Sequence, residues 1–144
     1  MLYDDFLKKL KQCPFCLPQE RIIEKKLSFL TYALAPYHMD HLLVVPNRHC
    51  ESFLDLRKKE RDEMLDLVNL AVRILHSFGY KDCSILGRDG DNAGKSIKHF
   101  HFHIIPKVLL GDIDNYRKER KILSQKDVDK IIRKIKTIIK NKRL

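Results

Sequence analysis

The sequence predicts an α+β fold, with an antiparallel sheet, one long central helix and an amphipathic helix near the C-terminus. Two observations support this prediction. Apolar stretches of strand length lie before and after one long segment of helical periodicity, rather than alternating with many helices. With 144 residues, 44% of them hydrophobic, the chain has enough material for one domain with one core.

The first half of the chain starts with a short helix in residues 1–12, where apolar side chains follow helical spacing. Residues 13–16, Cys-Pro-Phe-Cys, are expected to form a knuckle-like turn. Strands are then expected at 22–23, 27–35 and 41–46. Pro46 ends the last of these, because proline cannot donate to a strand ladder.

The second half contains the two long helices. Residues 55–78 carry one apolar face, and Gly79 stands where a C-cap glycine is expected. Strands are predicted at 83–86 and 97–105, with a polar, glycine-containing loop at 87–94. From Ser124 to Ile139, apolar residues at helical spacing predict an amphipathic helix with lysines and arginines on its other face. We expect residues 1–110 to form the main domain and residues 111–144 a basic helical extension packed on it.

Positive charge is concentrated in that extension. Residues 107–144 contain 13 lysines and arginines against 5 acidic residues, whereas residues 1–106 contain 16 against 14. Such a balance suits an anionic partner, namely a phosphorylated ligand, RNA or a membrane surface. A solvated lysine-rich helix explains the same charge, and the sequence leaves both interpretations open.

Several classes of protein are disfavoured. No apolar run approaches the ~20 residues of a membrane span, and the N-terminal segment lacks the apolar core of a signal peptide. Four cysteines in 144 residues do not make a disulfide scaffold, and two of them are spaced Cys-x-x-Cys, which favours a metal site. We therefore expect a cytoplasmic protein with no membrane partner.

Three histidines alternate with phenylalanines from His99 to His103. On a strand, all three histidines would share one face, and Phe100 and Phe102 would point into a core. A rise of ~3.3 Å per residue separates His99 from His103 by ~13 Å, too far for one ion with Zn–N bonds of ~2.0–2.1 Å. The three histidines must therefore have different roles.

These motifs resemble the histidine triad family of nucleotide hydrolases and transferases. His99-x-His101-x-His103 followed by Ile-Ile-Pro is similar to the family signature. Residues 40–49 resemble its Gly-His-hydrophobic-Pro-Lys-x-His segment, and residues 94–97 its Gly-Gln-Ser-Val run. The Cys-x-x-Cys at 13–16 is similar to that of the zinc-carrying members. The resemblance covers about residues 10–110.

The resemblance implies a nucleotide site on the sheet, usually in a homodimer, and a covalent nucleotidyl-histidine intermediate. It makes His101 the nucleophile on the α-phosphate, held by a backbone carbonyl near His99. His103 and Ser96 would contact the phosphate or protonate the leaving group. The residues implied to bind the substrate are Gly94, Lys95, Arg88 and His41.

A zinc site is the second implication of the resemblance. Cys13 and Cys16 have the spacing of one half of a tetrahedral site. The family pattern supplies the other half as His49 and His99, so that structural zinc would brace the nucleophile. The rival interpretation is a pair of reduced cysteines with His49 on the surface.

The chain departs from the family pattern in the residues that select the substrate. Ala33 falls where the family has an Asn or Asp that grips the ribose hydroxyls, and Lys95 replaces a Gln. Arg88 falls near a usual Asn. Two extra cations would suit a more negative substrate. The run from Gly90 to Ser96 is no P-loop, because its first glycine is missing and a strand follows.

We expect a hydrolase that attacks the α-phosphate of a nucleotide. Dinucleoside polyphosphates are the first candidates as substrates, and nucleoside phosphoramidates the second. The alternative is a module that binds nucleotides or RNA ends on the same fold, aided by the basic C-terminal helix. The base, the leaving group, the number of phosphates and the oligomeric state are left open by the sequence.

Overall fold

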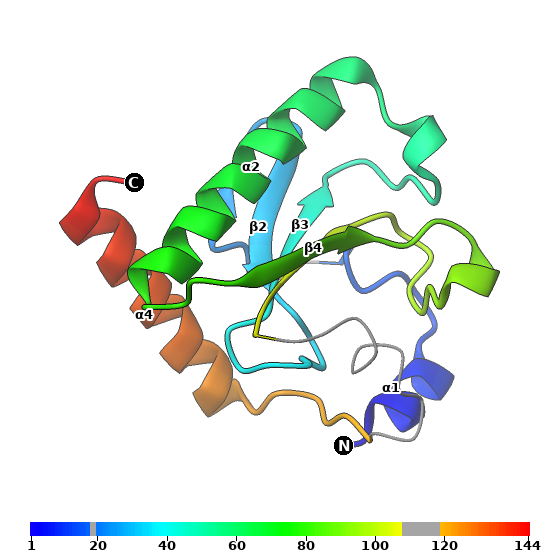
Figure 1. Ribbon diagram of the computed structural model, residues 1–144. Helices are drawn as coiled ribbons and strands as arrows, with labels where there is room; N and C mark the ends of the chain where they lie inside the picture. Colours follow the sequence, from blue (N-terminus) through cyan, green and yellow to red (C-terminus); the bar gives the residue numbers. More distant parts are fainter. Residues whose placement is uncertain (18–19, 108–118) are drawn as a thin grey trace.

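The structure, a computed structural model, describes residues 1–17, 20–107 and 119–144 (Figure 1). Five antiparallel strands form one sheet in the order β1-β2-β3-β5-β4, which confirms the predicted α+β class. The described elements are α1 (Tyr3–Lys9), β1 (Ile23–Glu24), β2 (Ser28–Tyr32), β3 (Leu42–Pro46), η1 (Phe53–Asp55), α2 (Lys58–Ser77), β4 (Cys83–Gly87), η2 (Asp91–Ala93), β5 (Phe102–Pro106) and α4 (Gln125–Lys142).

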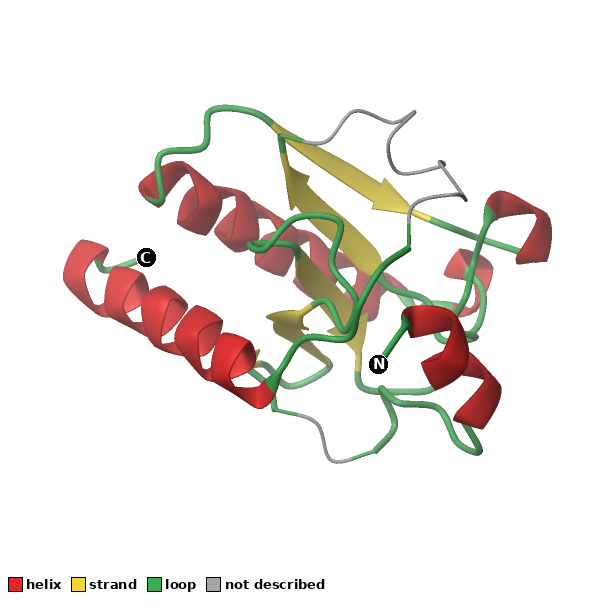
Figure 2. Cartoon of the chain, turned by 90° about the horizontal axis from the view of Figure 1, so that it is seen from below, coloured by secondary structure: helices red, strands yellow, loops and turns green. Residues whose placement is uncertain are grey.

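Both long helices lie on one side of the sheet, and α1 lies on the other (Figure 2). Helix α2 packs on β2, β3 and β5, and α4 packs on α2 and β2. The core between these layers contains Leu42 and Val44 of β3, Met64 and Ile74 of α2 and Ile135 of α4. The apolar stripes that predicted the two helices are therefore the faces that cover the sheet.

The other face of the sheet has a smaller core. Leu43 and Val45 of β3 meet Phe29, Phe15 and Ile97 there. All five residues of β3 are buried, because side chains on both of its faces are covered. This explains why the strand is a continuous apolar run in the sequence rather than an alternating one.

The helix ends follow local chemistry. Helix α2 ends before Gly79, whose φ of 94° lies in the left-handed region that glycine tolerates. Helix α4 begins after Ser124, whose side chain accepts a hydrogen bond from the Asp127 N–H. It is anchored by Lys134, which pairs with the buried carboxylate of Asp40 at 3.0 Å. Lys134 is thus a structural residue and not part of a free basic face.

The predicted strand over residues 97–105 is wrong at its start, since β5 begins at Phe102. Continuing the register of β3 with β5 would place Pro46 opposite Phe100, and proline has no N–H for the ladder. The Phe100 N–H instead donates to the Cys50 carbonyl at 2.6 Å. His99 therefore lies in a bend before the strand, and the three histidines do not share one strand face.

The described part of the C-terminal extension runs back along the N-terminus before α4. Tyr3 N–H donates to the Arg120 carbonyl at 2.9 Å, and Ile122 N–H donates to the Met1 carbonyl at 3.0 Å. The predicted boundary at residues 110 and 111 lies outside the described residues. Among the described helices, none combines the length and the apolar character that crossing a membrane requires.

Candidate active site and metal centre

A cavity lies on the face of the sheet that the long helices leave uncovered. Side chains from β3, β5 and the loop before β5 form its base, and its rim includes Tyr3 of α1, Tyr37 after β2 and Arg120. Its lining residues are Tyr3, Phe15, Ala33, Leu34, Ala35, Tyr37, His41, Leu43, Arg88, Gly94, Lys95, Ser96, Ile97, His101, His103 and Arg120. The cavity thus collects most of the residues that the sequence motifs single out.

His101 is held in the tautomer that leaves its Nε2 unprotonated. Its Nδ1 lies 2.7 Å from the backbone carbonyl of His99, which can only accept, so Nδ1 carries the proton. Nε2 then keeps its lone pair, and the ring lines the cavity. A neutral imidazole with a bare, oriented nitrogen is a competent nucleophile.

His103 is held in the opposite tautomer. The Tyr37 N–H donates to Nδ1 of His41 at 3.3 Å, so the proton of His41 is on Nε2. That Nε2–H donates to Nδ1 of His103 at 3.0 Å, which leaves the proton of His103 on its own Nε2. The ring centroids of His101 and His103 are 4.6 Å apart. The cavity therefore presents the unprotonated Nε2 of His101 beside the Nε2–H donor of His103.

Burial keeps these imidazoles neutral. Burial lowers the pKa of His101 to about 4, although the hydrogen bond to the His99 carbonyl opposes the shift. Burial, followed by the neighbouring histidines, lowers the pKa of His103 well below its usual value. The pKa of His41 is lowered to about 3, mainly by burial. At neutral pH the site therefore works with uncharged rings.

Cys13, Cys16, His49 and His99 converge beside the cavity, and one ligand atom from each lies within 4.8 Å of all the others. Nδ1 of His99 is 3.3 Å from Sγ of Cys13, and Nδ1 of His49 is 3.1 Å from Sγ of Cys16. Two thiols and two imidazoles in such a cluster fit a tetrahedral metal ion. The four residues named from the sequence thus form one cluster that could hold a metal.

His99 connects the metal cluster to the nucleophile. Its Nε2 donates to the Pro46 carbonyl at 2.9 Å, so its Nδ1 is the nitrogen that faces the thiols. Its own carbonyl accepts the Nδ1–H of His101. Phe15, inside the Cys-x-x-Cys turn, packs edge-on against both rings, with centroids 5.7 and 5.0 Å away. A shift of the cluster would therefore move His101.

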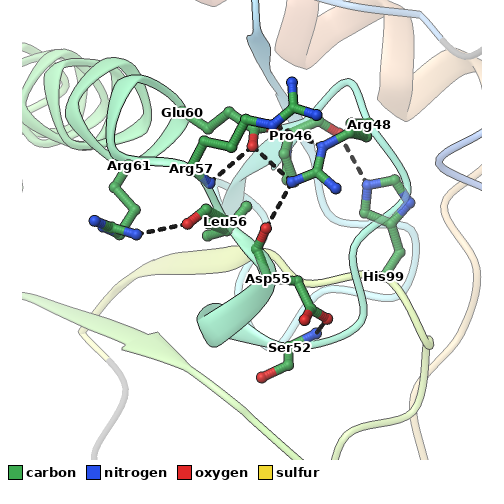
Figure 3. A network of polar contacts seen from close by, with 9 residues as sticks. All are labelled: Pro46, Arg48, Ser52, Asp55, Leu56, Arg57, Glu60, Arg61 and His99. Atoms are coloured by element: carbon green, nitrogen blue, oxygen red, sulfur yellow. Dashed lines mark hydrogen bonds and ion pairs between the residues drawn. The ribbon is translucent and has the colours of Figure 1, made fainter.

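A polar network supports the segment that carries Pro46 and His49 (Figure 3). Glu60 of α2, only 3% exposed, accepts from Arg48 Nη2 at 2.8 Å and from the Arg57 N–H at 2.9 Å. The hydrogen bond from Arg48 lowers the pKa of Glu60. Sequence reasoning missed this pair, because Arg48 and Glu60 are twelve residues apart and an arginine at the N-cap is not a recognised capping signal.

The loop before β5 supplies the remaining motif residues. The Ser96 hydroxyl is 2.8 Å from the Tyr3 hydroxyl, and Gly94 adopts a φ of 79° at the end of η2. Lys95 and Arg88 line the cavity, but their ammonium and guanidinium groups donate to the backbone carbonyls of Glu51 and Ala93. His41 is 2% exposed and lies behind His103.

Sequence reasoning also missed Tyr3, Tyr37 and Arg120. Each lies outside the recognised motifs, and only the fold brings them to the cavity. No spacing in the sequence signals their proximity.

The chain is similar in sequence to a family of known proteins. The family model described as HIT domain matches residues 16–108. The chain is 27% identical over 137 residues to an uncharacterized HIT-like protein of Methanocaldococcus jannaschii, covering 86% of this chain and 98% of that protein. It is 30% identical over 101 residues to an adenosine 5'-monophosphoramidase of Schizosaccharomyces pombe, covering 66% and 74%. It is 30% identical over 126 residues to a bis(5'-adenosyl)-triphosphatase of Dictyostelium discoideum, covering 81% and 84%.

Solved structures show the same fold. A hypothetical histidine triad nucleotide-binding protein from Sulfolobus tokodaii matches with a TM-score of 0.72 at 25% identity, covering 90% of this chain and 93% of that one. The diadenosine triphosphate hydrolase of Plasmodium falciparum matches with a TM-score of 0.72 at 27% identity, covering 85% and 78%.

Proposed function

The chain belongs to the HIT domain family, and from this premise we propose that it is a nucleotide hydrolase that acts through a nucleotidyl-histidine intermediate. The single observation that carries the proposal is the pair of opposite tautomers at His101 and His103 in one cavity. The similarity to a triphosphatase and a phosphoramidase supports a phosphoanhydride or phosphoramidate bond as the target. Dinucleoside polyphosphates are the preferred substrate class.

In the proposed reaction, Nε2 of His101 attacks the α-phosphorus and the bond from phosphorus to the leaving group breaks. The Nε2–H of His103 donates a hydrogen bond to the oxygen on which charge develops, and so does the Ser96 hydroxyl. Water then attacks the phosphorus and releases one proton. The electron pair of the phosphorus–nitrogen bond returns to His101, and the nucleoside monophosphate leaves.

The test is intact-protein mass spectrometry during turnover of diadenosine triphosphate and of adenosine 5'-phosphoramidate. The wild-type chain should gain the mass of one nucleotidyl group, and His101→Ala should gain none and lose turnover. His76→Ala removes an exposed histidine at the end of α2 and serves as the matched control. Full turnover by His101→Ala would exclude the assignment of the nucleophile.

Zinc is the proposed occupant of the Cys13, Cys16, His49 and His99 cluster. Two thiolates and two imidazoles are a common donor set for structural zinc, and Nδ1 of His99 already faces the thiols. The bound ion would fix the position of His99 and therefore of the carbonyl that orients His101.

We also propose that two copies associate through β4. This strand forms an edge of the sheet, and its Ile85 is 52% exposed on the solvent side. An exposed, apolar edge strand is a template for pairing with a second strand. Light scattering should show a dimer for the wild-type chain and a monomer for Ile85→Lys, and a wild-type monomer would contradict the proposal.

A further inference from the structure

We propose that Arg120 binds a second phosphate group of the substrate, distinct from the phosphate that His101 attacks. The inference rests on the proposed function, since it requires a nucleotide in the cavity. It concerns a residue outside the motifs, which reaches the site only through the return of the chain along the N-terminus.

The guanidinium of Arg120 is held in place before any ligand binds. Its Cζ lies 4.2 Å from the ring centroid of Tyr37 and 4.5 Å from that of Tyr3. Its Nη1 donates to the Ala35 carbonyl at 3.0 Å. Stacking on aromatic rings and one hydrogen bond fix the plane of the guanidinium at the cavity wall, so little side-chain entropy remains to be lost on binding.

The position of Arg120 is separate from that of the other cations of the cavity. Lys95 and Arg88 belong to the loop after β4, whereas Arg120 lies beside the segment that follows β2. Tyr3 contacts both sides, since its ring packs on the guanidinium with Cζ 4.5 Å from the ring centroid, and its hydroxyl is 2.8 Å from the Ser96 hydroxyl. The guanidinium therefore lies beside the place of the attacked phosphate, on the other side of Tyr3 from Ser96. A neighbouring phosphate group of the substrate would reach it there.

The charges of the cavity favour an anion at Arg120. None of the described residues that line the cavity is acidic, and no ion pair joins Arg120 to a carboxylate within the described ranges. A guanidinium has five N–H donors and matches two phosphate oxygens at once. In dinucleotide sites of the Rossmann fold, a carboxylate binds the ribose hydroxyl and an arginine binds a phosphate on the ribose, which shows how the two side chains suit the two ligand groups. Ala33, at this side of the cavity, offers no group for hydroxyls.

The alternative is that Arg120 only holds the N-terminus in place. That connection, however, is made by backbone hydrogen bonds, from Tyr3 N–H to the Arg120 carbonyl and from Ile122 N–H to the Met1 carbonyl. These bonds do not need the guanidinium. The charge of Arg120 can therefore be removed while the backbone connection is retained.

The second phosphate has two chemical sources, and calorimetry with unreactive ligands separates them. AMP carries one phosphate, ADP adds one on the leaving-group side, and adenosine 3',5'-bisphosphate adds one on the ribose. The wild-type chain should bind at least one of the two-phosphate ligands about tenfold more tightly than AMP. The ligand that gains affinity identifies the source.

Arg120→Gln should abolish most of that gain and leave the dissociation constant of AMP within about twofold. Arg120→Lys should retain part of it, because the charge remains without the planar fork. Lys121→Gln removes one charge from an exposed neighbour outside the cavity and should retain the full gain. Thermal melting of each variant reports whether it folds.

Three results would overturn the inference. The first is that the wild-type chain binds AMP but gains nothing from either second phosphate, a result that leaves the hydrolase proposal intact. The second is that Arg120→Gln weakens the binding of all three ligands equally, which would indicate a structural role. The third is that Lys121→Gln loses as much affinity as Arg120→Gln, which would indicate a general electrostatic effect rather than a contact. Failure of the wild-type chain to bind AMP or to form the His101 adduct would instead remove the proposed function itself.

Discussion

Replacing His41 by phenylalanine should slow the reaction through His103, although His41 is buried behind it. The phenyl ring keeps the packing against Tyr37, whose ring centroid is 5.8 Å away, but it removes the N–H that Nδ1 of His103 accepts. Leaving a buried acceptor without its hydrogen bond costs ~1–3 kcal/mol. Since each 1.36 kcal/mol changes a rate tenfold, kcat/KM should fall by about 5- to 160-fold.

The assay combines steady-state kinetics with nitrogen NMR of the imidazole rings. At pH 7 the wild-type chain should show His101 protonated on Nδ1 and His103 protonated on Nε2. His41→Asn, whose amide can donate, should recover part of the lost activity, and the thermal midpoint of His41→Phe should not fall in parallel with kcat/KM. The reasoning is refuted if the wild-type spectrum shows the same tautomer in both rings, or if His41→Phe keeps full activity.

Three further predictions follow from the metal cluster, the buried histidines and the basic helix. Cys13→Ser should lower the zinc content of protein purified without chelator, together with its thermal midpoint, because site assembly is coupled to folding. Cys83→Ser, outside the cluster, should leave the zinc content unchanged. Elemental analysis that finds no zinc in the wild-type chain would contradict this. The free energy of unfolding from urea titrations should be lower at pH 5 than at pH 7 by about 2 kcal/mol for each of His41 and His101. In the folded state, burial lowers the pKa of His41 to about 3 and that of His101 to about 4, so both rings stay neutral at pH 5. In the unfolded chain the same rings bind protons below about pH 6.5, which favours unfolding as the pH falls. A pH-independent free energy would show that these rings are not buried as described. Neutralising three exposed lysines of α4, Lys136, Lys140 and Lys142, should lower kcat/KM modestly for all anionic substrates. The loss should fade as salt is added, because the Debye length is ~8 Å at physiological ionic strength. Selective loss of RNA binding with unchanged nucleotide turnover would instead show that this helix binds nucleic acid.

The helices and most strands were predictable because their signals are local. The apolar stripe of α2 and its stop at Gly79 need only the helical period and one left-handed residue. The start of β5 was not predictable in this way. It depends on Pro46, a residue more than fifty positions earlier, which ends the ladder opposite Phe100.

The sequence by itself determined which reactive side chains lie near one another. His101 and His103 are two apart, and Cys13 and Cys16 are three apart, so their spacing predicts two neighbouring imidazoles and two thiols that could form half of a metal site. Residues two apart share a face on a strand, and a turn brings residues three apart together, so these pairs need only local structure.

Only the tertiary structure decided how that chemistry is organised. The tautomer of His103 depends on His41, sixty-two positions away, and the rim of the cavity depends on Tyr3 and Arg120, which meet where the segment before α4 runs along the N-terminus. The physical reason is that hydrogen bonds and stacked rings act over a few ångströms in space. Sequence patterns report such distances only for residues of the same helix, strand or turn.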